Sequence, residues 1–202
     1  RGLTGIGSPT RMRFTQADPQ LAAILTGLLH RDDVEGQRLV GAGLSLLALE
    51  RPIRAALEAS DPTALPAAAP ALLLALLERT VIADRDWEHL LTRLRAELLV
   101  DFRSLDNDRA PLAQALAAQM LATDFACAIT EPEAETLTGL QPTGGALTAD
   151  HVRLALYAPL PVDTAALASP PDWAAFCERH LHRPTAEREA AATTPALTAI
   201  ED

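Results

Sequence analysis

Lysine is absent from the 202 residues, so all seventeen basic side chains are arginines. Without lysine, the chain cannot form a Schiff base or use a lysine amine as a general base. Aromatic residues make up only 3% of the sequence, and valine and isoleucine are also few. Because β-branched and aromatic side chains favour strands, this scarcity argues against a sheet-dominated fold.

Cysteine occurs only at Cys127 and Cys177, and neither lies in a CxxC or a Cys/His spacing. We expect two free thiols in a reducing, cytoplasmic location, and the alternative is a disulfide between them. The most apolar run, 67–77, is interrupted by Pro70 and is too short to cross a bilayer of roughly 30 Å, so no membrane partner is expected. The chain shows no signal peptide and begins at Arg1 rather than Met, which predicts a trimmed protein or a fragment.

Positive charge is in deficit, since the formal net charge is −10 and the pI is about 4.9. An acidic chain repels phosphate backbones, so no nucleic-acid partner is expected. The basic cluster consists of Arg1, Arg11 and Arg13. We interpret it as a solvated tail, and the alternative is a binding arm.

What the sequence does contain is 40 alanines and 35 leucines, both of which favour helix. Apolar residues recur at helical spacing along most of the chain. We therefore predict an all-α fold, either a bundle of roughly eight helices or a short helical solenoid, with no significant sheet. Residues 1–16 are expected to be a flexible lead-in and 17–202 a single domain, which may be subdivided near 60–70. The predicted helical stretches span approximately 19–29, 34–50, 53–59, 71–79, 84–99, 109–128, 131–137, 150–158, 172–182 and 185–193.

Two of these helices carry specific expectations about packing. The stretch 71–79 is apolar nearly all round, which predicts a central buried helix. In the stretch 34–50, Gly41 and Gly43 are poor helix formers, and their presence predicts a close approach to another helix. Pro52 is expected to end or kink that helix.

The strongest candidate for a metal site is Cys177 and Glu178 with His180 and His182. Residues two apart on a helix point about 200° apart, so the two histidines do not share a face. A closed zinc site needs about four ligands, so we interpret this segment as a half-exposed helix end.

An acidic stretch that could carry acid–base chemistry consists of Asp124, Glu131, Glu133 and Glu135. They have no histidine or glycine-rich partner nearby, so we interpret them as a solvated face. No serine lies in a GxSxG elbow. The residues alone therefore assign no catalytic, cofactor-binding or metal-binding side chain.

Three segments resemble one known family. They are 70–95 (PALLLALLERTVIADRDWEHLLTRLR), 119–131 (QMLATDFACAITE) and a third in pieces, 154–160 (LALYAPL), 183–189 (RPTAERE) and 197–202 (LTAIED). In this order they are similar to the helical region that precedes the catalytic domain in bacterial SAM-dependent methyltransferases of the tetratricopeptide-associated type. The family's Gln-Cys-Phe-x-Asn-Glu-Tyr motif corresponds to 119–125, with Thr123 and Asp124 in place of its Asn-Glu pair.

The resemblance implies a non-catalytic accessory domain that positions a substrate or docks a partner. That partner would be a separate protein or a methyltransferase domain continuous with this chain. The residues that the resemblance marks as an interaction surface are Gln119, Thr123, Asp124 and Tyr157. No glycine-rich strand-to-helix turn is present, so no SAM or other cofactor and no methyl transfer are expected from this chain alone.

Two further functions stay open from the sequence. The first is a stand-alone helical protein–protein interaction module, monomeric or homodimeric, with no enzymatic link. It needs only the Ala/Leu-rich packing and the acidic surface. The second is a small helical enzyme or metal protein that uses 177–182.

Overall fold

The computed structural model describes residues 14–66, 68–140, 142, 145–160, 167–183 and 186. Within these ranges the chain forms nine α-helices and no strand, which confirms the predicted all-α class. The sheet-like pairing there is a single parallel bridge between Ala146 and Ala168. The helices are α1 (Pro19–Leu29), α2 (Val40–Leu47), α3 (Arg51–Ala59), α4 (Ala71–Arg79), α5 (Arg85–Asp101), α6 (Ala110–Ala122), α7 (Glu131–Thr138), α8 (Ala149–Ala155) and α9 (Ala174–Cys177).

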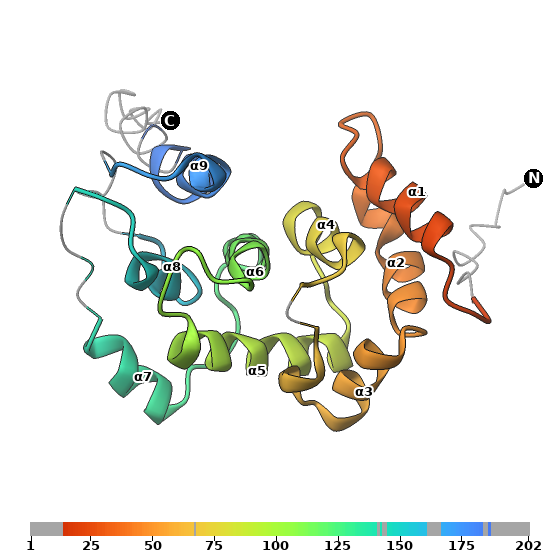
Figure 1. The fold of residues 1–202 in the computed structure, drawn as a ribbon, viewed down its shortest axis with the longest axis horizontal. Helices are drawn as coiled ribbons and strands as arrows, with labels where there is room; N and C mark the ends of the chain where they lie inside the picture. Colours follow the sequence, from red (N-terminus) through yellow and green to blue (C-terminus); the bar gives the residue numbers. More distant parts are fainter. Residues whose placement is uncertain are drawn as a thin grey trace, which may run out of the picture.

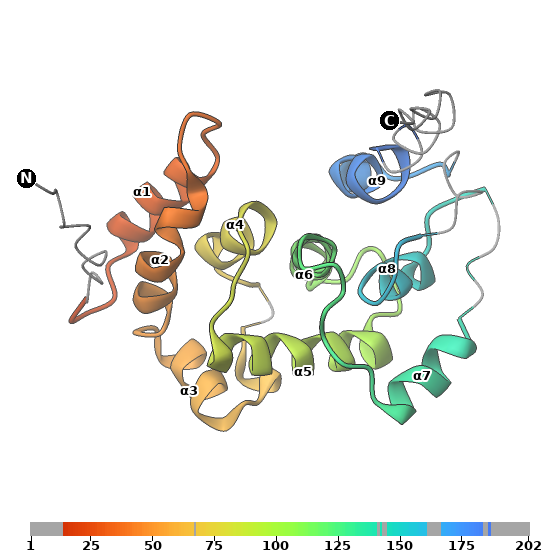
Figure 2. The same cartoon turned by 180° about the vertical axis from the view of Figure 1, so that it is seen from behind.

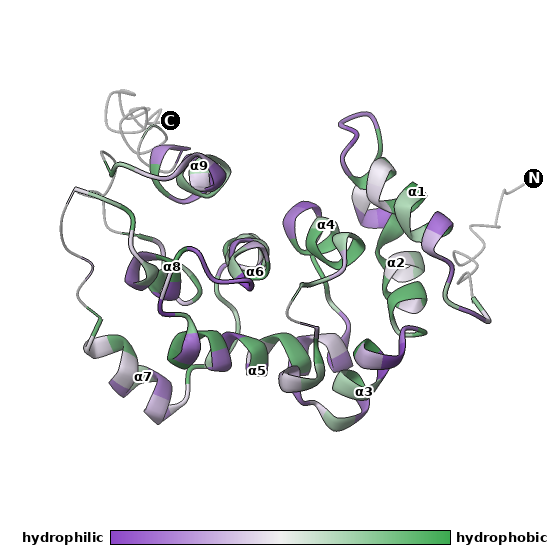
Figure 3. Cartoon of the chain, viewed as in Figure 1, coloured by the Kyte–Doolittle hydropathy of each residue, from purple (hydrophilic) through white to green (hydrophobic). Residues whose placement is uncertain are grey.

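The helices are arranged around α5, the longest of them, which runs beneath α4 and α6 (Figure 1). At one end of the molecule, α1 and α2 pack against α4, and α3 contacts the beginning of α5. At the other end, α7 and α8 contact α5, and α9 lies beyond α6. The view from behind shows the same order (Figure 2). Figure 3 shows that α2 and α4 are predominantly hydrophobic, whereas α7 is mostly hydrophilic.

Helix α4 is the central buried helix that its composition predicted. Leu72, Leu73, Leu76 and Leu77 are all nearly inaccessible to solvent. They belong to one cluster of buried hydrophobic side chains that extends from α1 to Leu181. Burying a leucine side chain contributes about 1.5–3 kcal/mol, so this cluster is the main source of stability.

The predicted helix over 34–50 is divided in the structure. A 3₁₀ turn, Gly36–Leu39, precedes α2, which ends at Leu47. Glu50 then takes extended backbone angles and is the N-cap of α3. Pro52 therefore lies in the first turn of a new helix and does not end the old one. Proline is tolerated there because the backbone N–H that it lacks would have no acceptor within the first turn of a helix.

The two glycines of α2 differ in their surroundings. A Cβ on Gly43 would lie 2.9 Å from Cδ1 of Leu76 on α4, so the predicted close approach is confirmed there. A Cβ on Gly41 would meet nothing within 4 Å, so the prediction is wrong at that position.

Two helices end in left-handed residues that are not glycine. Ser60 after α3 and Asp124 with Phe125 after α6 all have positive φ angles of about 50°. After α6, Phe125 N donates to Met120 O at 2.8 Å and Asp124 N to Leu121 O at 3.1 Å, which is the Schellman pattern. The helix predicted to reach residue 128 therefore ends at Ala122.

The last described helical segment widens as it ends. Helix α9 continues into a π-helical turn, Glu178–His182. Cys127 and Cys177 are both free thiols, as predicted. No helix in the described part of the chain is long and apolar enough to span a membrane. The predicted lead-in up to residue 13, which contains the basic cluster, lies outside the described residues, as do most of the predicted helix over 185–193 and the segment 197–202.

Candidate docking groove

The four residues marked as an interaction surface do not lie on one surface. Gln119 is buried, and with its amide oriented to match its neighbours it donates to Thr80 O at 2.9 Å and accepts from Ile82 N at 3.0 Å. Tyr157 is also buried, in a different part of the core. Thr123 is half-buried and donates to the backbone of α6, and Asp124 is exposed. Of these four residues, only Asp124 fits the expected surface.

Tyr157 belongs to a buried polar cluster with Arg95 and Glu133. Its hydroxyl donates to Oε1 of Glu133 at 2.6 Å, and the Arg95 guanidinium carbon lies 4.2 Å from the centre of its ring. Nη2 of Arg95 contacts the same Glu133 oxygen at 3.3 Å and donates to Ala128 O at 2.6 Å. Nη1 donates to Cys127 O at 3.3 Å.

Glu133 corrects the expectation of a solvated acidic face, because it is only 7% exposed while Glu131 and Glu135 are exposed. Its second oxygen accepts from both the backbone N and the hydroxyl of Thr130, each at 2.7 Å. Burial raises its pKa, but the hydrogen bonds from Tyr157 and Thr130, with Arg95 nearby, outweigh burial and hold the pKa below its usual range. The Thr-x-x-Glu capping box at 130–133 is the local sequence signal for this arrangement.

This cluster joins four parts of the chain: helix α5, the segment after α6, helix α7 and the turn after α8. Arg95 is fully buried, and burial together with the bond to Glu133 raises the pKa of the Tyr157 hydroxyl well above its ordinary value. The three polar side chains form hydrogen bonds with one another and with nearby backbone groups. Within the cluster, Nε of Arg95 has no hydrogen-bond partner. Such a closed network fixes the packing of helices and leaves little surface for a ligand.

The segment 177–182 is a half-exposed helix end, as predicted. Cys177 and His180 are buried, whereas His182 is exposed and its Nδ1 lies 3.2 Å from Oε2 of Glu178. The His180 ring stacks on Phe176 with centroids 4.5 Å apart. Burial, helped by Arg179, lowers the pKa of His180 to about 4. Among the described residues, no group of three or more His, Cys, Asp or Glu side chains is placed to hold a metal ion.

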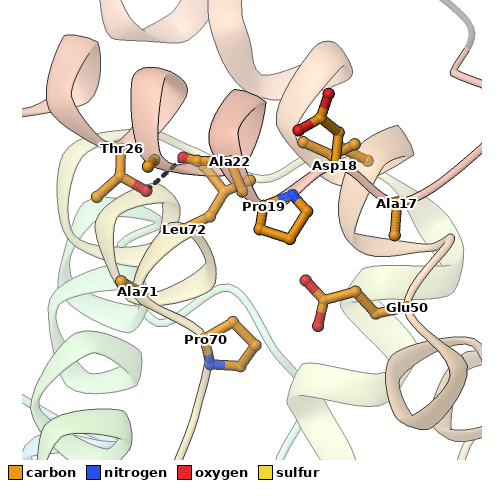
Figure 4. A pocket seen from close by; sticks show the side chains of 11 residues that line it. Ala17, Asp18, Pro19, Ala22, Thr26, Glu50, Pro70, Ala71 and Leu72 are labelled. Carbon is orange, nitrogen blue, oxygen red and sulfur yellow. Dashed lines mark hydrogen bonds between the residues drawn. The ribbon is translucent and has the colours of Figure 1, made fainter.

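An open groove lies between α1, the turn after α2 and the beginning of α4 (Figure 4). Its volume is about 550 Å³, within the range typical of ligand and peptide sites. The hollow exists because the facing positions carry small side chains, including the exposed Ala23 and Ala71. The lining residues are Ala17, Asp18, Pro19, Ala22, Ala23, Thr26, Leu46, Glu50, Pro70, Ala71 and Leu72.

The polar groups of the groove are few and differ in how they are bonded. Asp18 caps α1, since its carboxylate accepts from Gln20 N at 2.9 Å and Leu21 N at 3.2 Å. The Thr26 hydroxyl donates to Ala22 O at 2.8 Å. The Glu50 carboxylate extends into the space between Pro19 and Pro70 (Figure 4). The lining contains no basic side chain.

A second open cleft lies between the end of α4, the beginning of α6 and the turn before α9. Its volume is about 570 Å³, and its lining includes the acidic residues Glu78, Asp106 and Asp172 together with Trp173. It also has no basic residue in its lining. Both described clefts are therefore negatively charged, as the net charge of the chain would favour.

Comparison of the chain with protein-family models, with curated proteins and with solved structures finds no match.

Proposed function

We propose that this chain is a helical protein–protein interaction module that docks a partner segment in the groove between α1 and α4. The observation that carries the proposal is the groove itself, which is open, has largely apolar walls and is bordered by exposed alanines. Grooves between helices receive amphipathic helices in many complexes, because the apolar face of the incoming helix is buried there. No chemistry by the chain itself is required for this function.

The electrostatics of the described residues support docking over acid–base catalysis at this place. Catalytic acids and bases have shifted pKa values and face a cleft. The buried residues with shifted pKa values here are Glu133, His151, Tyr157 and His180, and none of them lines the groove. All four lie in the interior of the fold.

A narrower form of the proposal names the partner as a methyltransferase domain, either continuous with the chain or separate. Its support is the order of the three similar segments along the sequence. Much of the first two segments is core, since most of α4 and the inner faces of α5 and α6 are buried. Ala/Leu-rich helices that build a core would also generate such similarity, so the interaction module is the broader and better supported form.

Site-specific photo-crosslinking in the native cells tests the proposal. A benzoylphenylalanine at Ala17, an exposed lining residue that precedes α1, is expected to give a discrete crosslinked adduct with a segment docked in the groove. The same residue at Val100, which is 51% exposed near the far end of α5, is the matched control. Equal adducts at both positions, or none at Ala17, would contradict docking in the groove. Adducts of twice the chain mass would identify the partner as a second copy.

A further inference from the structure

The docking groove contains one carboxylate without a counterpart. Glu50 is half-buried, and its carboxylate extends into the groove (Figure 4). The hydrogen bonds and ion pairs of the described residues give this carboxylate no partner, whereas the neighbouring Asp18 carboxylate accepts two backbone N–H groups. A charge that is partly desolvated and unpaired is unfavourable alone and becomes favourable when a ligand brings the opposite charge.

Helix dipoles at the groove do not reverse its sign. The N-termini of α1, α3 and α4 all lie at this groove, since Glu50 is the N-cap of α3, and each contributes about half a positive charge. Two carboxylates, Asp18 and Glu50, contribute a full negative charge each, so the local sum is about −0.5 and stays negative. The net charge of −10 adds a long-range attraction for cations.

We propose that the groove selects a helical partner segment that carries one arginine or lysine between apolar side chains. The cationic head would pair with Glu50, and the apolar side chains would cover Ala22, Ala23 and Ala71. This inference rests on the proposed docking function and adds the chemistry of the occupant. Small wall residues allow the backbone of the incoming helix to approach closely, while the one unpaired carboxylate, that of Glu50, fixes where its cation must lie.

The experiment is a selection from a phage-displayed library of short helix-forming peptides against the full chain. Enriched peptides are expected to share a basic residue at a fixed position among apolar ones. Replacing that residue by neutral citrulline should weaken binding about fivefold, the size expected for a half-exposed ion pair. With the Glu50→Gln variant, the arginine and citrulline peptides should bind equally.

Two further variants separate the failure of this inference from failure of the docking function. Glu58→Gln removes an exposed carboxylate of α3 outside the groove lining and should leave the preference for arginine intact. Ala23→Trp fills the groove and should abolish binding of every enriched peptide. Peptides that are blocked by Ala23→Trp but need no basic residue would overturn the cationic occupant and leave docking in place. An absence of any peptide blocked by Ala23→Trp would overturn both.

Discussion

At the scale of single residues, the buried guanidinium of Arg95 depends on Glu133 for its charge balance. Removing one partner of a buried ion pair leaves the other charge uncompensated. We expect Glu133→Ala to lower the free energy of unfolding by about 3 kcal/mol, measured by urea denaturation. Glu135→Ala, on the exposed side of the same helix, should change it by less than about 0.5 kcal/mol. Equal losses of unfolding free energy in the two variants would show that the buried ion pair does not stabilise the fold.

His180 makes stability depend on pH. Its pKa is about 4 in the folded chain and near its ordinary value of 6.5 when unfolded, because folding buries the ring. As the pH falls below 6.5, His180 is protonated in the unfolded chain but stays neutral in the folded chain. The contribution of His180 to the free energy of unfolding is therefore complete above pH 6.5 and is lost as the pH falls towards 4. Between pH 7 and pH 5 this loss is about 2 kcal/mol.

The variant His180→Leu isolates this contribution, since leucine fills the buried position with an apolar side chain that does not titrate. Its free energy of unfolding should fall less than that of the parent chain between pH 7 and pH 5. His151, whose pKa is also lowered by burial, supplies the residual slope in the same direction. Identical pH slopes for the variant and the parent chain would refute the assignment to His180.

At the scale of helices, the contact between α2 and α4 is set by one missing side chain. Gly43→Ala would place a methyl group 2.9 Å from Leu76, which is fully buried and has little room to move. We expect a net loss of about 1 kcal/mol, because overpacking exceeds the gain in helix propensity. Gly41→Ala has open space and should gain about 0.5 kcal/mol. Thermal unfolding of the pair measures the difference, and a gain in both variants would exclude a tight contact.

Helix positions and buried faces could be predicted from the sequence, but several helix ends could not. The stretch predicted as buried, 71–79, coincides with α4, because its pattern of leucines is local information. The end of α6 was missed because its left-handed residues are Asp124 and Phe125, whereas glycine is the usual signal. The break between α2 and α3 was predicted from Pro52, but its position was not, because nothing in the local pattern distinguishes a turn at 48–50 from a continuing helix.

At the scale of the whole molecule, the groove has no local signature at all. It exists because Ala23 and Ala71, which are far apart in sequence, both line a space that neither small side chain fills. The polar cluster was partly readable, since Thr130 and Glu133 form a capping box. That Arg95 pairs with Glu133 depends on how α5 and α7 meet, which no spacing within either helix reveals.

The continuity of the core predicts how the whole chain unfolds. Buried side chains from α1 to Leu181 form one cluster, and Leu65, in the segment where a subdivision was considered, is part of it. Trp87 and Trp173 are both buried on the C-terminal side of that segment, so fluorescence reports that side alone, while circular dichroism reports all helices. Because shared packing couples the two sides, their urea midpoints and m-values should coincide. A circular dichroism transition that separates into two steps, with fluorescence following only one, would establish two independent units.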